Sequence, residues 1–322
     1  MLYIIAIIIL ILLELCYFRL AQQFDIADNA CKRSSHKERT IRGGGFIFFA
    51  GAWLWYLFFG QRYGYFMAGL SIAAIVSFID DIKSLNIKTR LIAQISAISL
   101  VFVQLGIYSD FAWWTWLIWL IMAVGIVNAF NFMDGINGIT CSYSISVLLP
   151  LIYLNNTCNF IDSSYLVLAA ASVLIFGYFN FRKKAICFAG DVGSISIAVI
   201  IIFALLQLII KTGNYYYFTL LAVYGTDTGM TLLRRVSKHE NLWLAHRTHA
   251  YQIMVNEMGK PHLAVAILYS ILQLFISAGL ILCNSYHYTY MAIVIVVLSI
   301  SYWGFMAKTT KKAEFTKREH RL

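Results

Sequence analysis

Apolar segments long enough to cross a membrane recur along the whole chain. A helix needs about 20 mainly apolar residues, with a range of roughly 17 to 25, to cross the hydrocarbon core of a bilayer. Charged and turn residues divide the sequence into eleven such segments, near residues 1–22, 44–60, 64–79, 91–107, 111–130, 138–154, 164–181, 193–210, 214–231, 263–283 and 288–307. With 61% hydrophobic and 12% charged residues, the chain has too few polar side chains to cover a soluble globule of its size. The sequence therefore predicts an all-α, polytopic integral membrane protein with eleven transmembrane helices.

Lysine and arginine are distributed unevenly between alternate connections. One set of connections, together with Arg19 and the C-terminal tail, holds 23 of the 25 basic residues, whereas the other set holds only Arg62 and Lys211. Because basic residues mark cytoplasmic loops, we expect the N-terminus outside and the C-terminus in the cytoplasm. The net charge of +10 then reflects membrane orientation, and no nucleic-acid partner is expected.

Five aspartates lie near the ends of the predicted helices, on the side that the charge count makes cytoplasmic: Asp80, Asp81, Asp134, Asp191 and Asp227. A carboxylate in or beside a membrane helix costs about 2.5 to 3.5 kcal/mol on insertion scales, so each one needs a reason. Two adjacent carboxylates repel each other unless a cation or a proton lies between them, which makes Asp80 and Asp81 suited to metal-phosphate chemistry. A solvated acid pair at a helix end is the alternative for this pair taken alone.

A second block combines amides, an acid and glycines. Asn128, Asn131 and Asp134 follow one another at intervals of three residues, so they share a helix face. Gly135 and Gly138 then let the chain bend and bring backbone N–H groups close to a ligand. An ordinary helix cap rarely needs several amides and an acid together, so this block indicates a binding site.

A third block places Asp191 between Gly190 and Gly193, with Ser194 next, at the start of a predicted helix. Small residues on both sides of one acid leave room for a hydrated metal ion, and a helix N-terminus attracts phosphate oxygens. Simple capping of the helix by the aspartate is the alternative.

Basic and glycine-rich residues complete the polar clusters. His246, Arg247 and His249 follow Asp227 along the chain, and an arginine can hold a phosphate through two hydrogen bonds. The two histidines could also bind a metal ion, but no acid has the spacing that an H-E-x-x-H site requires. Arg42 precedes three glycines, which suggests a close approach of the backbone to another group.

These blocks resemble the polyprenyl-phosphate N-acetylhexosamine-1-phosphate transferase family, glycosyltransferase family 4, in their order across residues 29–252. The resemblance is carried by the Asp80-Asp81 pair, the block from Asn128 to Gly138, Phe179-Asn180 ahead of the Gly190 block, and the histidine-bearing loop. It implies a ten- or eleven-helix fold with residues 1–307 as one transmembrane catalytic domain and 308–322 as a basic cytoplasmic tail. It also implies Mg²⁺, with Mn²⁺ as a substitute, a UDP-activated sugar, an undecaprenyl-phosphate acceptor and release of UMP.

The resemblance further implies roles for single residues. Asp191 is similar in position to the magnesium ligand, and Asp80 and Asp81 to the essential pair near the lipid phosphate. His246 and His249 complete the predicted catalytic set, on a loop that contacts the diphosphate and the sugar. The predicted substrate-binding residues, with Phe188 beside the uracil, are Asn128, Asn131, Asp134, Asn180, Phe188, Arg247, Gly43, Gly44 and Lys83.

The sequence departs from the family pattern at three places, and one of them bears on the branch of the family. Arg39-Thr-Ile-Arg42 stands where many relatives carry Pro-Thr-Pro-Arg, and Asn137 replaces a third acid. The loop Ala-His-Arg-Thr-His-Ala-Tyr-Gln at 245–252 lacks the consecutive histidines of the peptidoglycan branch, which favours initiation of O-antigen or another surface polysaccharide. We therefore expect an enzyme of the bacterial inner membrane with its site facing the cytoplasm, and a homodimer as a further association.

Two other classes of protein compete with this interpretation. A secondary transporter also places ionisable residues in membrane helices, but its site lies near the bilayer midplane on broken helices within internal repeats, and no repeat is visible here. A membrane scaffold without activity would not require the aspartates. The six cysteines form no C-x-x-C and fall mostly in apolar runs, so we expect small core residues rather than disulfides or a zinc site.

Overall fold

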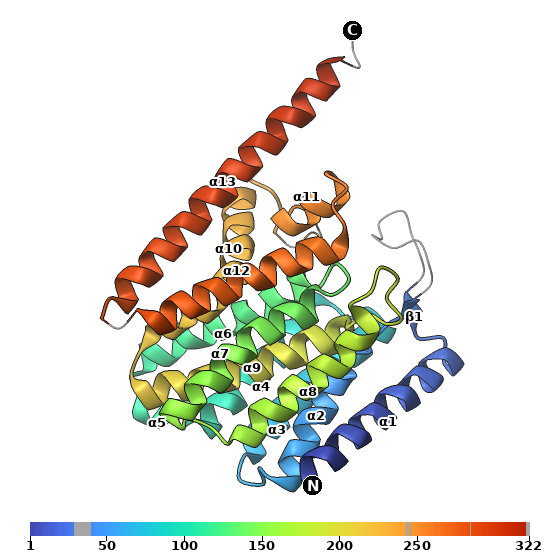
Figure 1. Cartoon of the computed structure of the whole chain (residues 1–322), viewed down its shortest axis with the longest axis vertical. Helices are drawn as coiled ribbons and strands as arrows, with labels where there is room; N and C mark the ends of the chain where they lie inside the picture. The colour runs from blue at the N-terminus through green and yellow to red at the C-terminus, as the bar shows by residue number, and fades with distance from the viewer. Residues whose placement is uncertain (29–39, 243, 245, 284, 320–322) are drawn as a thin grey trace.

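A computed structural model of the chain shows a bundle of helices with one very small sheet (Figure 1). The structure describes residues 1–28, 40–242, 244, 246–283 and 285–319, and side chains as far as residue 309. The predicted loop cations Lys32, Arg33, Lys37 and Arg39, and most of the predicted basic tail, lie outside the described residues and side chains. The elements are α1 (Leu2–Gln23), β1 (Ala27–Asp28), β2 (Thr40–Ile41), α2 (Phe46–Phe58), α3 (Gly64–Ile82), α4 (Ile87–Gln104), α5 (Ile107–Asp110), α6 (Trp113–Met133), α7 (Ile139–Cys158), α8 (Ser163–Asn180), α9 (Gly190–Thr212), the 3₁₀ helix η1 (Tyr215–Leu221), α10 (Ala222–Ser237), α11 (Ala250–Asn256), α12 (His262–Leu282) and α13 (His287–Glu319).

Helices joined by short connections pack beside one another in opposite directions. Only residues 83–86 separate α3 from α4, and only 159–162 separate α7 from α8. Short connections of this kind favour antiparallel neighbours. Helix α1 starts at one end of the molecule, and the long α13 extends beyond the bundle at the other (Figure 1).

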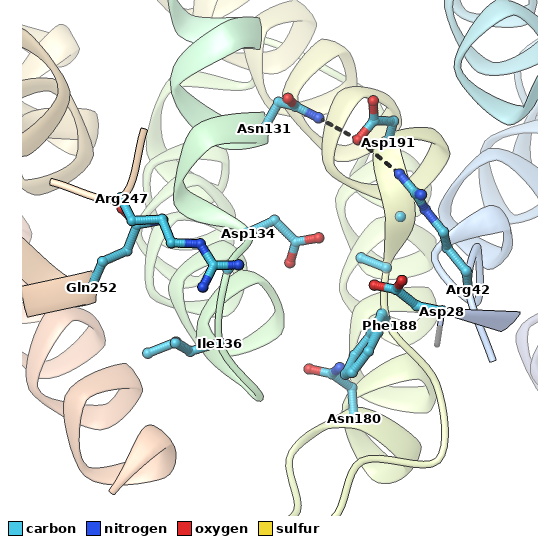
Figure 2. Close-up of a pocket in the computed structure, with 13 residues that line it drawn as sticks. Asp28, Arg42, Asn131, Asp134, Ile136, Asn180, Phe188, Asp191, Arg247 and Gln252 are labelled. Carbon is cyan, nitrogen blue, oxygen red and sulfur yellow. Dashed lines mark hydrogen bonds and ion pairs between the residues drawn. The ribbon is translucent and has the colours of Figure 1, made fainter. Parts of the chain in front are cut away.

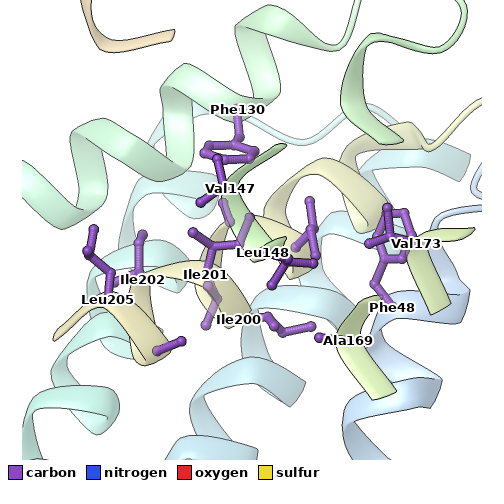
Figure 3. Close-up of a cluster of buried hydrophobic side chains, with 14 of the residues drawn as sticks. Phe48, Phe130, Val147, Leu148, Ala169, Val173, Ile200, Ile201, Ile202 and Leu205 are labelled. Carbon is purple, nitrogen blue, oxygen red and sulfur yellow. The ribbon is translucent and has the colours of Figure 1, made fainter. Parts of the chain in front are cut away.

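Helix α9 forms the centre of the bundle. Every residue from Val192 to Leu206 is buried, as expected for a helix that is apolar on all sides. Figure 3 shows its isoleucines packed between side chains of four other helices, among them Phe130 of α6 and Val147 of α7. The N-terminus of α9, which carries Asp191, therefore sits on a rigid support.

The outer helices present apolar side chains away from the core. Ile4 of α1 and Ile300 of α13 are 65% and 67% exposed. By length and composition, eight helices among the described residues could cross a membrane: α1, α3, α4, α6, α8, α9, α12 and α13. These features are those of an all-α, multi-pass membrane protein. The count of eleven spans and the orientation of the termini stay predictions.

Each of the eleven predicted segments overlaps an observed helix, but two boundaries differ in a way that affects the site. The predicted segment at 64–79 continues as α3 to Ile82, so Asp80 and Asp81 lie in the last helical turn instead of in a loop. The predicted segment at 214–231 is divided into η1 and α10, which places Asp227 inside α10. Asp80, Asp81 and Asp227 are all buried. Each of them pairs with a basic side chain, which offsets the cost of burying a carboxylate within a helix.

Candidate active site

Asp81 holds the start of α9. Its side chain is fully buried, and its two oxygens accept the backbone N–H groups of Asp191 at 2.9 Å and Val192 at 3.0 Å. The first N–H groups of a helix have no partner within the helix, so a carboxylate at this position can accept their hydrogen bonds. Its negative charge also interacts favourably with the positive end of the helix dipole. Asp81 thus fixes the position of Asp191 through the backbone.

Two arginines surround the carboxylate of Asp191. Arg42 Nε contacts Asp81 at 2.8 Å and its Nη2 lies 3.9 Å from Asp191. Arg90 contacts Asp80 at 3.2 Å and Asp191 at 3.1 Å. Each member of the Asp80-Asp81 pair therefore has its own arginine, and both arginines also reach Asp191.

The amides of the second block lie on the same side of α6 and differ in their partners. The side chain of Asn131 donates hydrogen bonds to Asp191 at 2.9 Å and to the Ser194 hydroxyl at 3.1 Å. Asn128, one turn earlier, donates to the side chain of Gln94 at 2.7 Å. Asn131 belongs to the site around Asp191, and Asn128 supports the packing of α6 against α4.

The connection between α6 and α7 is held by amides. Asn180 accepts the N–H of Gly138 at 2.8 Å and donates to the carbonyl of Cys187 at 2.8 Å, so it ties this connection to the loop before α9. Gly138 has φ +83°, a conformation that glycine adopts without strain. The side chain of Asn137 is buried and donates to two backbone carbonyls, so it supports the loop instead of presenting a charge.

Asp134 lies at the end of α6 and accepts a hydrogen bond from the hydroxyl of Thr140. Burial raises the pKa of Asp134 to about 6, although the hydrogen bond from Thr140 opposes this shift. Asp134 therefore titrates much closer to neutral pH than an ordinary aspartate does.

These groups meet around a cavity of about 270 Å³. Figure 2 shows Asp134 between Arg42 and Asp191 on one side and Arg247 on the other. The lining residues are Asp28, Arg42, Asn131, Asp134, Gly135, Ile136, Asn180, Phe188, Ala189, Gly190, Asp191, Arg247 and Gln252. The cavity thus combines carboxylates, guanidinium groups, amides and one aromatic ring, which suits a ligand with phosphates and a flat base.

The histidine-bearing loop contributes Arg247 to this cavity, while its two histidines lie behind it. The ring centroids of His246 and His249 are 5.0 Å apart. Partial burial, together with the nearby His249 and Arg235, lowers the pKa of His246 to about 4. His246 is consequently neutral at pH 7 in the protein without substrate, whereas Arg247 brings a positive charge to the cavity.

Four predicted substrate-binding residues do not line the cavity: Asn128, Gly43, Gly44 and Lys83. The N–H of Gly44 donates to the carbonyl of Phe188 at 2.8 Å, and a side chain on Gly43 would collide with Tyr17. The close approach predicted for the glycines is thus an approach to other protein groups. Lys83 is exposed at the end of α3.

The donor groups around Asp191 fit a magnesium ion that is shared with a substrate. Mg²⁺ is usually bound by one or two carboxylates together with waters and substrate phosphates. Among the described residues, no three His, Cys, Asp or Glu side chains are placed to hold a metal ion by themselves. The alternative of a metal site on His246 and His249 therefore lacks a third protein ligand in this part of the chain.

A protein-family model matches the part of the chain that carries most of this site. Residues 63–209 match the model of glycosyl transferase family 4. The matched region contains the Asp80-Asp81 pair, the block from Asn128 to Gly138 and Asp191, whereas Arg42 and Arg247 lie outside it. The match supports the resemblance found in the sequence and indicates a sugar-phosphate transferase. No curated protein matches the chain significantly.

Some residues of the cavity could not be identified from the sequence. Asp28 lies in β1, which pairs antiparallel with β2, and no motif surrounds it. Gln252 lies in the first turn of α11. In the sequence, only its position shortly after Arg247, at the end of the histidine-bearing loop, indicated that it could belong to the site. Arg90 does not line the cavity, but it contacts both Asp80 and Asp191, and no motif in the sequence indicated these ion pairs.

Proposed function

We propose that this protein transfers N-acetylhexosamine 1-phosphate from a UDP-sugar to undecaprenyl phosphate and releases UMP. The observation that carries the proposal is the position of Asp191 between Arg42 and Arg90, at the border of a polar cavity and at the ends of membrane helices. Phosphoryl transfer requires mainly positioning and charge neutralisation, and both are available there. The family match supports the reaction class.

The donor binds in the cavity in this proposal. Arg247 contacts its diphosphate from one side and Arg42 from the other, with Phe188 beside the uracil and Asn131 holding the carboxylate of Asp191 in place. Asp191 is the residue that would hold Mg²⁺, and a bound Mg²⁺ would neutralise charge on the diphosphate.

The acceptor phosphate attacks directly. An oxygen of the lipid phosphate forms a bond to the sugar-linked phosphorus, the bond from this phosphorus to the UMP oxygen breaks, and UMP leaves with that electron pair. An anionic phosphate needs little help from a general base at pH 7. Because Asp81 already accepts two N–H groups and an arginine, we assign it a positioning role in place of a covalent one.

The cellular setting follows from the sequence. The uneven distribution of lysine and arginine favours a site that faces the cytoplasm of a bacterium, where soluble UDP-sugars are present. The loop at 245–252 favours initiation of O-antigen or another surface polysaccharide. A homodimer in the inner membrane belongs to the same proposal.

Release of UMP tests the proposed reaction. Purified protein is incubated with undecaprenyl phosphate, Mg²⁺ and each member of a panel of UDP-N-acetylhexosamines. We expect UMP with at least one donor, only when the lipid phosphate is present, and none after chelation of the metal. Absence of UMP with every donor would refute the proposal, and transport of a solute without UMP would favour the transporter class.

A further inference from the structure

Among the residues that the structure describes, Asp227 has more hydrogen-bond partners than any other carboxylate outside the cavity lining. It lies inside α10 with 4% of its surface exposed. One oxygen accepts the backbone N–H of Ala250 at 3.0 Å and lies 3.3 Å from His249 Nδ1, and the other accepts the hydroxyl of Tyr269 at 2.7 Å. The hydroxyl of Thr231 adds a further hydrogen bond at 3.2 Å.

His249 is as well enclosed as its partner. Only 1% of its surface is exposed, and its ring lies 6.2 Å from the ring of Phe132 and 5.0 Å from that of His246. Its backbone N–H faces the side chain of Gln252, which lines the cavity together with Arg247. The ring is thus fixed directly behind the residues that form one side of the site.

The two nitrogens of this ring have different surroundings. Nδ1 faces the carboxylate of Asp227, whereas Nε2 is buried and has no hydrogen-bond partner among the described residues. A carboxylate next to one ring nitrogen keeps the proton on that nitrogen and leaves the other as an acceptor in the neutral ring. A buried polar atom without a partner is rare and needs an explanation.

We propose that Asp227 is a positioning residue that fixes the orientation and tautomer of His249, so that this ring supports the side of the cavity that carries Arg247 and Gln252. The expected effect on transfer rests on the proposed function, whereas the tautomer does not. Asp227 acts through His249 and does not touch the substrate itself.

The first measurement is the tautomer of His249, which needs no substrate. We would label the histidines with ¹⁵N, record nitrogen shifts of the purified full-length protein at pH 8, and assign His249 from its loss in His249→Asn. We expect the proton on Nδ1 in the wild type and a loss of this preference in Asp227→Asn. A proton on Nε2 in the wild type, or an unchanged tautomer in Asp227→Asn, would overturn the inference whether or not the protein is a transferase.

The second measurement is a double-mutant cycle in the transfer reaction. If Asp227 acts through His249, Asp227→Asn lowers kcat by about 10- to 100-fold in the wild-type background and has almost no further effect in the His249→Asn background. Equal losses in both backgrounds would mean that Asp227 has an independent, structural role, and would overturn the inference.

Tyr269→Phe is the matched control, because it removes a hydrogen bond to the same carboxylate without touching His249. We expect it to retain the tautomer and to lower kcat much less than Asp227→Asn does. If Asp227→Asn does not fold, Tyr269→Phe and Thr231→Val still test the inference, because each removes one hydrogen bond to Asp227. A variant that no longer keeps the proton on Nδ1 of His249 but retains the full kcat would contradict the inference. Absence of transfer in the wild type, with the expected tautomer, would refute the proposed function alone.

Discussion

At the scale of residues, neighbouring carboxylates of this protein have different tasks. Asp81 is fully buried and accepts N–H groups at the start of α9, whereas the side chain of Asp191 is 18% exposed and lines the cavity. Both contact Arg42. Sequence motifs alone placed both residues in the catalytic set, because a motif does not show which carboxylate accepts backbone hydrogen bonds.

Replacing each of these two aspartates by asparagine shows which one contributes to stability and which one to the transfer rate. We expect Asp81→Asn to destabilise the protein by about 1 to 3 kcal/mol, because it removes the charge that pairs with Arg42 and holds the start of α9. We expect Asp191→Asn to retain the melting temperature and to lower transfer by about 100-fold or more. Thermal unfolding and initial rates in detergent measure both effects, and the reverse pattern would contradict these assignments.

Asp134 gives the protein a pH-dependent contribution to stability. Burial raises its pKa to about 6 in the folded protein from 3.8, so the folded state binds this proton more tightly than the unfolded state does. The resulting stability is fully present below pH 3.8 and is lost as the pH rises through 6. We therefore expect the melting temperature of the wild type to fall more steeply between about pH 4 and about pH 6 than that of Asp134→Asn. Parallel curves for the two proteins would show that Asp134 does not titrate in this range.

At the scale of elements, the site depends on the contact between the glycine turn before α2 and the start of α9. A Cβ atom on Gly45 would overlap the Cα atom of Gly193 and would lie 2.8 Å from the carbonyl oxygen of Ala189. This contact places Arg42, three residues earlier, beside Asp191. The structure thus gives the glycine turn a packing role.

Gly45→Ala should push the two elements apart. We expect a lower melting temperature and a loss of transfer of about tenfold or more, because a misplacement of about 1 Å at a catalytic site can lower a rate by roughly 100-fold. Gly125→Ala is the control: nothing lies within 4 Å of the added atom, and alanine favours the interior of α6 by roughly 0.5 to 1 kcal/mol. A wild-type rate and melting temperature in Gly45→Ala would show that the turn tolerates the displacement.

The sequence predicted the helices well because apolar segments of membrane length leave few alternatives. It also predicted that Asn131, Asp134 and Asp191 are near one another, since their blocks lie at helix ends on one side. It could not predict the ion pairs of Arg90 or the place of Asp28, because both depend on how helices and a two-residue strand pack across long sequence separations. The hydrogen bonds of Asp227 were missed for the same reason: its partners lie on α11 and α12.

At the scale of the whole molecule, the orientation in the membrane is the main untested expectation. The start of α1 and the end of α13 lie at opposite ends of the molecule (Figure 1). The residues that line the polar cavity include the ends of α6 and α8 and the start of α9. With the N-terminus outside, the cavity would face the cytoplasm. A reporter that is active only in the cytoplasm should work when fused after Leu322 and fail when fused before Met1. The opposite result would invert the topology and place the cavity outside.

Transfer of a labelled phosphate shows directly whether Asp191 supports the proposed reaction. With ³²P in the sugar-linked phosphate of the accepted UDP-sugar, we expect the label to move to undecaprenyl phosphate. We expect Asp191→Asn to abolish this transfer and Asp110→Asn, which changes an exposed acid that does not line the cavity, to retain it. Label that stays on the nucleotide, or full transfer by Asp191→Asn, would refute the proposed reaction.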